Sequence, residues 1–136
     1  MKQPVRNMAK KEKGEELHLP TDADVDKYEM LEKLLDSIYN EMKEFSKKKP
    51  DEPLNKFKVT NVNRVLAQIK EIMKDEPTDE FLDLLDEDTL PSTSDSIIVI
   101  GQFRAAMEQY RAKYYKRVPG SGNRWHTKEF PRGQVE

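Results

Sequence analysis

The sequence predicts an all-α fold: an antiparallel three-helix bundle with an additional short acidic helix and flexible tails. Two observations carry this prediction. In three segments the large apolar side chains recur at steps of three and four residues, a spacing that places them on one stripe of a helix. Outside residues 97–100, no run has the character of a strand, so a sheet would lack partners.

Composition narrows the class of protein. The chain has 136 residues, 35% of them hydrophobic and 37% charged, a lean apolar content that long amphipathic helices can accommodate. The net charge of -2 argues neither for nor against nucleic acid. The chain has no cysteine and no apolar run near the roughly 18 residues of a membrane span. We therefore expect a soluble cytoplasmic protein with no membrane partner.

The first helix is expected over residues 22–48, after a flexible charged arm at 1–20. Thr21 is a good N-cap residue, and Asp24 stands where a capping box carries its acid. Pro50 ends the pattern. The apolar side chains form a coiled-coil-like seam of Tyr28, Leu31, Leu35, Ile38, Met42 and Phe45.

A second helix is expected over residues 60–75, with a start between Leu54 and Thr60. At about 1.5 Å per residue the first helix would extend roughly 39 Å and the second roughly 24 Å. Part of the first seam therefore stays uncovered unless the short helix, a tail or another chain covers it. The second stripe consists of Val59, Val62, Leu66, Ile69 and Met73.

A short acidic helix is predicted from Asp79 to about Glu87, closed by Leu90 and Pro91. Residues 76–95 hold eight acids and no bases, whereas residues 101–136 hold eight bases and three acids, so charge is segregated along the chain. The short helix is expected to cover its own bundle, or to dock in a basic groove of a partner. Its large apolar side chains are Phe81, Leu82, Leu84 and Leu85.

The third long helix is expected over residues 95–117. Residues 97–100 are β-branched and would suit a strand on their own, but the stripe that follows favours a helix: Ile100, Phe103, Met107, Tyr110 and Tyr114. Gly101 costs such a helix about 1 kcal/mol relative to Ala, and indicates close packing, a bend or a tolerated glycine. Ile98 lies off the stripe and is expected to be buried from a second side. An exposed Ile98 would make its surface the first candidate partner site.

Residues 119–136 have no helical or alternating period and are predicted to form an aromatic, basic tail after the helical domain of residues 21–118. Aromatic and arginine side chains are favoured anchors of interfaces, so the tail is expected to bind a partner or to fold back over the bundle. The predicted partner-binding residues are Arg124, Trp125, His126, Phe130 and Arg132 in the tail, and Phe81, Leu84 and Leu85 in the acidic helix.

Sites for metals are not predicted. Asp22, Asp24 and Asp26 imitate the opening of a calcium loop, but Lys27 and Lys33 occupy the positions that need Gly and Glu. Glu15 and His18 have the spacing of a di-iron ligand pair, yet the chain has no second such pair.

Catalytic motifs are also missing from the sequence. The two histidines fall in the expected tails, and no phosphate loop, dinucleotide fingerprint or nucleophile elbow occurs. We therefore predict a protein that is not an enzyme and uses no cofactor.

The predicted function is a non-enzymatic protein-protein interaction or assembly module, either a helical adaptor or a subunit of a complex. Its partner would be another protein or a second copy bound through the uncovered seam. The alternative is a nucleic-acid-associated accessory factor that uses the tail and the basic end of the last helix: Arg104, Arg111, Lys113, Tyr115, Lys116 and Arg117.

Overall fold

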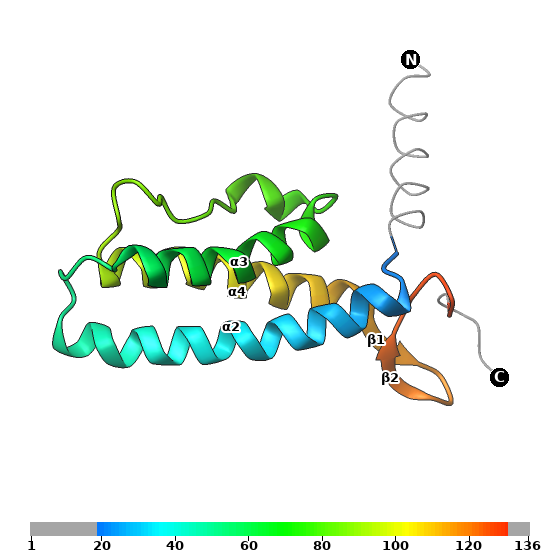
Figure 1. Cartoon of the computed structure of the whole chain (residues 1–136). Helices are drawn as coiled ribbons and strands as arrows, with labels where there is room; N and C mark the ends of the chain where they lie inside the picture. Colours follow the sequence, from blue (N-terminus) through cyan, green and yellow to red (C-terminus); the bar gives the residue numbers. More distant parts are fainter. Residues whose placement is uncertain (1–18, 131–136) are drawn as a thin grey trace, which may run out of the picture. The chain divides into compact units, whose positions relative to one another are not determined.

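A computed structural model of the chain describes residues 19–130 (Figure 1). This part is mostly helical, which confirms the predicted helical class. It contains a small antiparallel sheet as well, so the prediction of an all-α chain is wrong. The elements are α2 (Asp22–Lys48), α3 (Lys56–Met73), the 3-10 helix η1 (Pro77–Phe81), α4 (Thr93–Tyr114), β1 (Tyr115–Val118) and β2 (Gly122–Trp125). The predicted arm at 1–20 lies almost wholly outside the described residues.

The chain divides into two compact units. One is Asp26–Arg111, here called the helical unit. The other combines Met1–Val25 with Ala112–Glu136, of which residues 19–25 and 112–130 are described, and is here called the terminal unit. Each unit is described by itself below.

In the helical unit, α3 and α4 begin at the same end. The Leu54 N–H donates to the Pro91 carbonyl at 2.9 Å, and the Thr93 N–H donates to the Glu52 carbonyl at 2.9 Å. A β-bridge joins Pro53 to Ser92 beside these bonds. The two helices therefore run in the same direction, both opposite to α2 (Figure 1). The predicted antiparallel order holds for α2 and α3 but not for α3 and α4.

Side chains cap the helices where the sequence offers suitable residues. At the start of α2, the Thr21 hydroxyl accepts from the Asp24 N–H and the Asp24 carboxylate accepts from the Thr21 N–H, both at 3.0 Å. This reciprocal pair is the predicted capping box with Asp in the place of Glu. Asn55 accepts from the Lys58 N–H at 2.8 Å and starts α3. Ser92 does the same for α4 through the Asp95 N–H at 3.1 Å.

The predicted apolar stripes form the core. Tyr28 and Tyr110 stack with ring centroids 5.3 Å apart, and the Tyr28 hydroxyl donates to the Met107 carbonyl. On α2, Ile38 and Phe45 stay half-exposed, in contrast to the rest of the seam. The buried stripe residues of the helical unit are Tyr28, Leu31, Leu35, Met42, Val59, Val62, Leu66, Ile69, Met73, Ile100, Phe103, Met107 and Tyr110.

The acidic segment is not the predicted helix over 79–87. Only η1 is helical, and residues 82–86 then run along α3 without helical structure; residues 77–90 are here called the acidic strap. The Asn63 side chain, buried on α3, donates to the Leu85 carbonyl and accepts from the Leu85 N–H, both at 2.9 Å. Lys70 donates to the Leu82 carbonyl at 2.7 Å. Because α3 side chains bond these backbone groups, the strap has an alternative to helical hydrogen bonds.

Residues 97–100 belong to α4, so the favoured helical reading is confirmed. The expectation for Ile98 is wrong, since 61% of this residue is exposed. The exposure meets the condition for a candidate partner site, but Ile98 lines neither of the two pockets described below. It stands two positions before Ile100, on the side of α4 away from the stripe on which Ile100 and Phe103 are buried. A Cβ added at Gly101 would meet no atom within 4 Å, so this glycine is neither packed closely nor required by space.

In the terminal unit α4 ends at Tyr114, three residues before the predicted boundary, and the chain turns into a β-hairpin. Tyr115 pairs with Trp125, and Val118 pairs with Gly122. Gly120 at φ +84° and Gly122 at φ +78° supply the left-handed backbone of the turn. The predicted tail therefore supplies the turn of the hairpin, residues 119–121, and its second strand, β2.

Candidate functional site

An apolar groove of about 640 Å³ lies between α2 and α3 in the helical unit and is here called the α2–α3 groove. Phe57 projects beside it with 76% of its surface exposed, the largest exposure among the large hydrophobic residues that the structure describes. Met42 and Val62 are buried and contribute to the apolar wall. The groove is lined by Ile38, Glu41, Met42, Glu44, Phe45, Lys48, Phe57, Lys58, Asn61 and Val62.

The groove follows from the way in which α2 and α3 pair. Ile38, Met42 and Phe45 are the last three residues of the α2 seam, and at this end of α2 the first turns of α3 lie beside them. Phe57 stands in the first turn of α3, off the stripe that Val59 and Val62 bury. Phe57 is therefore not buried with the α3 stripe. Its ring stands at the border of the groove and leaves the groove open.

Charged side chains of both signs border the groove. Glu41, Glu44 and Lys48 come from α2, and Lys58 comes from α3. The Lys58 ammonium lies 4.6 Å from the centroid of the Phe45 ring, in the position of a cation–π contact. Two acids and two bases therefore surround one apolar surface.

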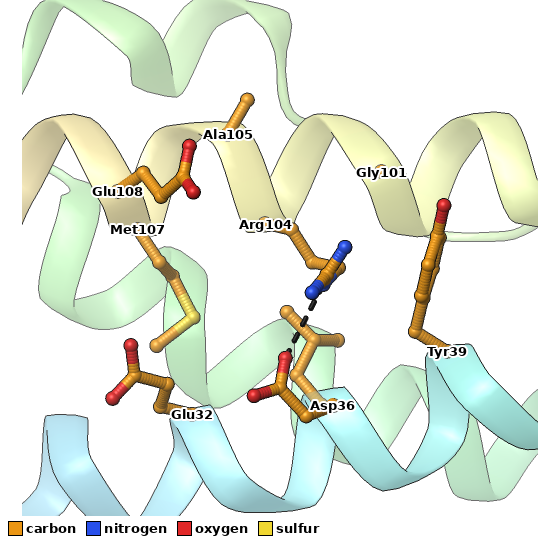
Figure 2. A pocket seen from close by; sticks show the side chains of 9 residues that line it. Glu32, Asp36, Tyr39, Gly101, Arg104, Ala105, Met107 and Glu108 are labelled. Carbon is orange, nitrogen blue, oxygen red and sulfur yellow. Dashed lines mark hydrogen bonds and ion pairs between the residues drawn. The ribbon is translucent and has the colours of Figure 1, made fainter.

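A second pocket of about 360 Å³ lies between α2 and α4 and is mainly polar (Figure 2). Arg104 reaches from α4 toward α2, with its Nε 3.2 Å from the Asp36 carboxylate and its guanidinium 4.2 Å from the Tyr39 ring centroid (Figure 2). Arg111 pairs with Glu32 at 3.2 Å. Both ion pairs join α4 to α2, and the pocket itself is lined by one base, Arg104, and by three acids, Glu32, Asp36 and Glu108.

One titratable group in the helical unit is clearly perturbed by burial. Desolvation, together with the Glu32 carboxylate, raises the pKa of the Tyr28 hydroxyl well above its ordinary value of 10.0. Tyr28 stacks on Tyr110 inside the core and does not line either pocket. The shift therefore reflects the burial of the hydroxyl in the core.

The predicted tail residues pack against one another in the terminal unit. The Arg124 guanidinium lies 3.3 Å from the Phe130 ring centroid, and Trp125 meets Tyr115 edge to face at 5.5 Å. His126 is buried, and its backbone N–H donates to the Tyr114 carbonyl at 2.8 Å. These residues already have internal contacts, which reduces what they can offer a partner. Arg132 lies outside the described residues.

The predicted residues of the acidic strap divide into two groups. Phe81 and Leu84 are exposed, at 65% and 41%, whereas Leu85 is buried against α3. Phe81 and Leu84 line neither of the two pockets described above.

The six residues proposed for nucleic acid are not equivalent. Arg104 and Arg111 are paired with acids of α2, as described above. Lys116 and Arg117 are exposed on β1. Lys113 lies 5.3 Å from the centroid of the Tyr114 ring, and Tyr115 packs on Trp125. Only the hairpin part of this set presents exposed positive charge.

Sequence reasoning missed Phe57 as a functional candidate. The residue lies in a segment whose helix start was left open between residues 54 and 60, and it does not belong to the α3 stripe. A large aromatic residue off the stripe and next to a Pro-bounded connection is the signal that could have marked it.

No family model matches the chain, and comparison with curated proteins and with solved structures gives no match either. Within residues 19–130, none of the helices is both long and apolar enough to span a membrane. The same range holds no group of three or more His, Cys, Asp or Glu residues able to bind a metal ion.

Proposed function

We propose that the chain is a non-enzymatic protein-interaction module that binds a protein partner in the α2–α3 groove. The observation that carries this proposal is the exposed Phe57 ring beside an apolar groove of about 640 Å³. Apolar grooves rimmed by polar residues are typical of protein-binding surfaces. Clusters of aromatic and aliphatic anchors supply most of the binding energy at such surfaces.

The proposal includes the setting of this groove. We take α2, α3 and α4 to pack as a three-helix bundle that holds the groove in a fixed shape, with the acidic strap as a cover along α3. The lack of cysteine is in keeping with a reducing compartment, and we place the protein in the cytoplasm as an adaptor or a subunit of a complex.

A photo-crosslinking amino acid at position 57 of the full chain tests the proposal. In cells that express the chain naturally, we expect a covalent adduct with a protein, and Asn61→Arg, which places a long charged side chain in the groove, should abolish it. The matched control carries the same crosslinker at position 81, where another phenylalanine is exposed outside the pockets. Equal adducts from both positions, or none from position 57, would contradict the proposal.

A nucleic-acid accessory role is the second candidate. Residues 113–128 hold five Lys or Arg and no acid, and the hairpin register sets Lys116 directly opposite Arg124. Side chains directly opposite in an antiparallel pair lie on the same face. A cationic face of this kind suits phosphate groups.

Binding to single-stranded nucleic acid across a salt series tests the second candidate. We expect affinity to fall steeply with salt, and Lys116→Glu to weaken binding to all sequences and to reduce the salt slope by about 1. Lys47→Glu, an exposed charge of the helical unit, is the control. No retention at low salt would end this candidate.

A further inference from the structure

The charged residues around the α2–α3 groove are Glu41, Glu44, Lys48 and Lys58. Their order makes the groove surface complementary in charge to the same surface of a second copy. Glu41, Glu44, Phe45 and Lys48 follow one another at steps of three, one and three on α2, so they share one face of the helix. Glu41 and Lys48 are seven residues apart, about 10 Å along the axis, and are too distant to pair within one helix.

From this arrangement we infer that the partner in the groove is a second copy of the same chain, bound about a two-fold axis that passes close to Phe45. The inference rests on the proposed function of the groove. Around such an axis the two α2 helices run antiparallel, and the same surface patch serves on both sides of the contact.

The antiparallel arrangement brings unlike charges together. With the axis between positions 44 and 45, Glu41 of each copy faces Lys48 of the other. Glu44 faces Phe45, on whose ring the Lys58 ammonium lies. Glu41 therefore meets a base across the axis, while Glu44 keeps its pairing with Lys47 of its own helix at 3.2 Å, and the contact is repeated by symmetry. A rim of one sign would instead repel its own copy.

Phe57 gives the same contact its apolar anchor. The ring is 76% exposed on each copy and borders a groove with space for a large side chain. In the two-fold arrangement Phe57 of one copy enters the groove of the other, beside Met42 and Val62. The patch thus supplies both the projecting side chain and the cavity that receives it, which an isologous interface requires.

Sedimentation velocity of the full chain over a range of concentrations tests the inference. We expect a species of twice the 16.0 kDa chain mass. Phe57→Asp should leave only monomer with an unchanged helical circular dichroism spectrum, because the residue is exposed. Phe81→Asp, the matched exposed phenylalanine, should leave the dimer intact.

Exchanging the charges at positions 41 and 48 tests whether Glu41 of one copy pairs with Lys48 of the other. Glu41→Lys alone and Lys48→Glu alone each place like charges together twice, and each should weaken the dimer about tenfold. A mixture of the two variants should form dimers with the affinity of the original chain, because in a mixed pair both contacts are attractive. Failure of the mixture to recover would overturn the antiparallel pairing.

The outcomes separate this inference from the function on which it rests. A chain that stays monomeric but forms an adduct with a different protein from position 57 keeps the interaction function and rules out the second copy. A dimer that is unaffected by Phe57→Asp, with no adduct from position 57, rules out both.

Discussion

Asn63 and Leu85 exchange two hydrogen bonds across 22 positions of the sequence, with the Asn63 amide bonding both the N–H and the carbonyl of Leu85 at 2.9 Å. Both residues are buried. One side chain of α3 therefore replaces the backbone partners that a helix or a sheet would give the acidic strap. Burial makes this pair of bonds costly to break, since neither Leu85 group could turn to water.

Asn63→Ala should lower the free energy of unfolding by about 2–4 kcal/mol, because it leaves a buried N–H and a buried carbonyl without partners. Urea unfolding followed by circular dichroism measures the change. Asn61→Ala is the control: the Asn61 amide donates to the Phe57 carbonyl at an exposed site, and its loss should cost less than about 0.5 kcal/mol. Similar effects of the two variants would show that the strap does not depend on Asn63.

Tyr28 should make the protein sensitive to alkaline pH. Its pKa is raised in the folded state, so the folded chain keeps a proton that the unfolded chain releases above about pH 10. The stabilisation is complete below that pH and is lost as the pH rises toward the folded pKa. Thermal unfolding between pH 8 and pH 11 measures this loss.

Tyr28→Phe removes the titrating group and the hydrogen bond to Met107. We expect about 1 kcal/mol of destabilisation at pH 8 and a smaller further loss on going to pH 11 than in the original chain. Tyr39→Phe, which keeps Tyr28 in place, should retain the full alkaline loss. An alkaline loss that is identical in all three proteins would assign it to other groups.

Gly101→Ala should stabilise the protein by about 0.5–1 kcal/mol. The added Cβ meets no atom within 4 Å, and Ala favours the helix over the unfolded chain more than Gly does. Gly120→Ala is the opposite case, because φ is +84° there and an L side chain is strained, so we expect a lower melting temperature. Destabilisation by Gly101→Ala would show that the pocket beside this glycine needs its space.

Asp86 should make the end of the acidic strap sensitive to acid. Its carboxylate accepts from the Asp88 and Thr89 N–H groups at 2.8 and 3.1 Å, which lowers its pKa below the ordinary value of 3.8. Its contribution to stability is complete above about pH 4 and is lost as the pH falls through the lowered pKa. The protection factor of the Thr89 amide, which compares its exchange rate with the intrinsic rate at the same pH, should fall at low pH. Asp86→Asn, which keeps an acceptor oxygen but does not titrate, should show less of this change.

The sequence was sufficient for the parts of the fold that depend on local signals. The range of α2, its capping box and the buried stripes of all three helices follow from cap residues and from spacing, which act within a few positions of the chain. The length of α2 against α3 also predicted that part of the α2 seam would stay uncovered, without indicating which part. The α2–α3 groove lies where the two helices run side by side, so the length difference did not predict it.

Three parts of the structure were missed, each for its own physical reason. The strap has a helical composition, but Asn63 and Lys70 bond its backbone, and no pattern within residues 77–90 reveals them. The hairpin strands have four residues each, too short for a periodic signal. Ile98 was expected to be buried from a second side because it lies off the apolar stripe, yet large apolar residues are often exposed singly.

The shared starting end of α3 and α4 sets a limit on how the chain could be shortened. Since α3 is 18 residues long, about 27 Å, residues 74–92 must travel back over that length before α4 begins. An extended chain needs at least about eight residues for this distance. A tight turn in place of the strap would reverse the direction of α4 and change how its buried tyrosine and methionine stripe meets α2. The strap is therefore a spacer, and the length of α3 sets its minimum length.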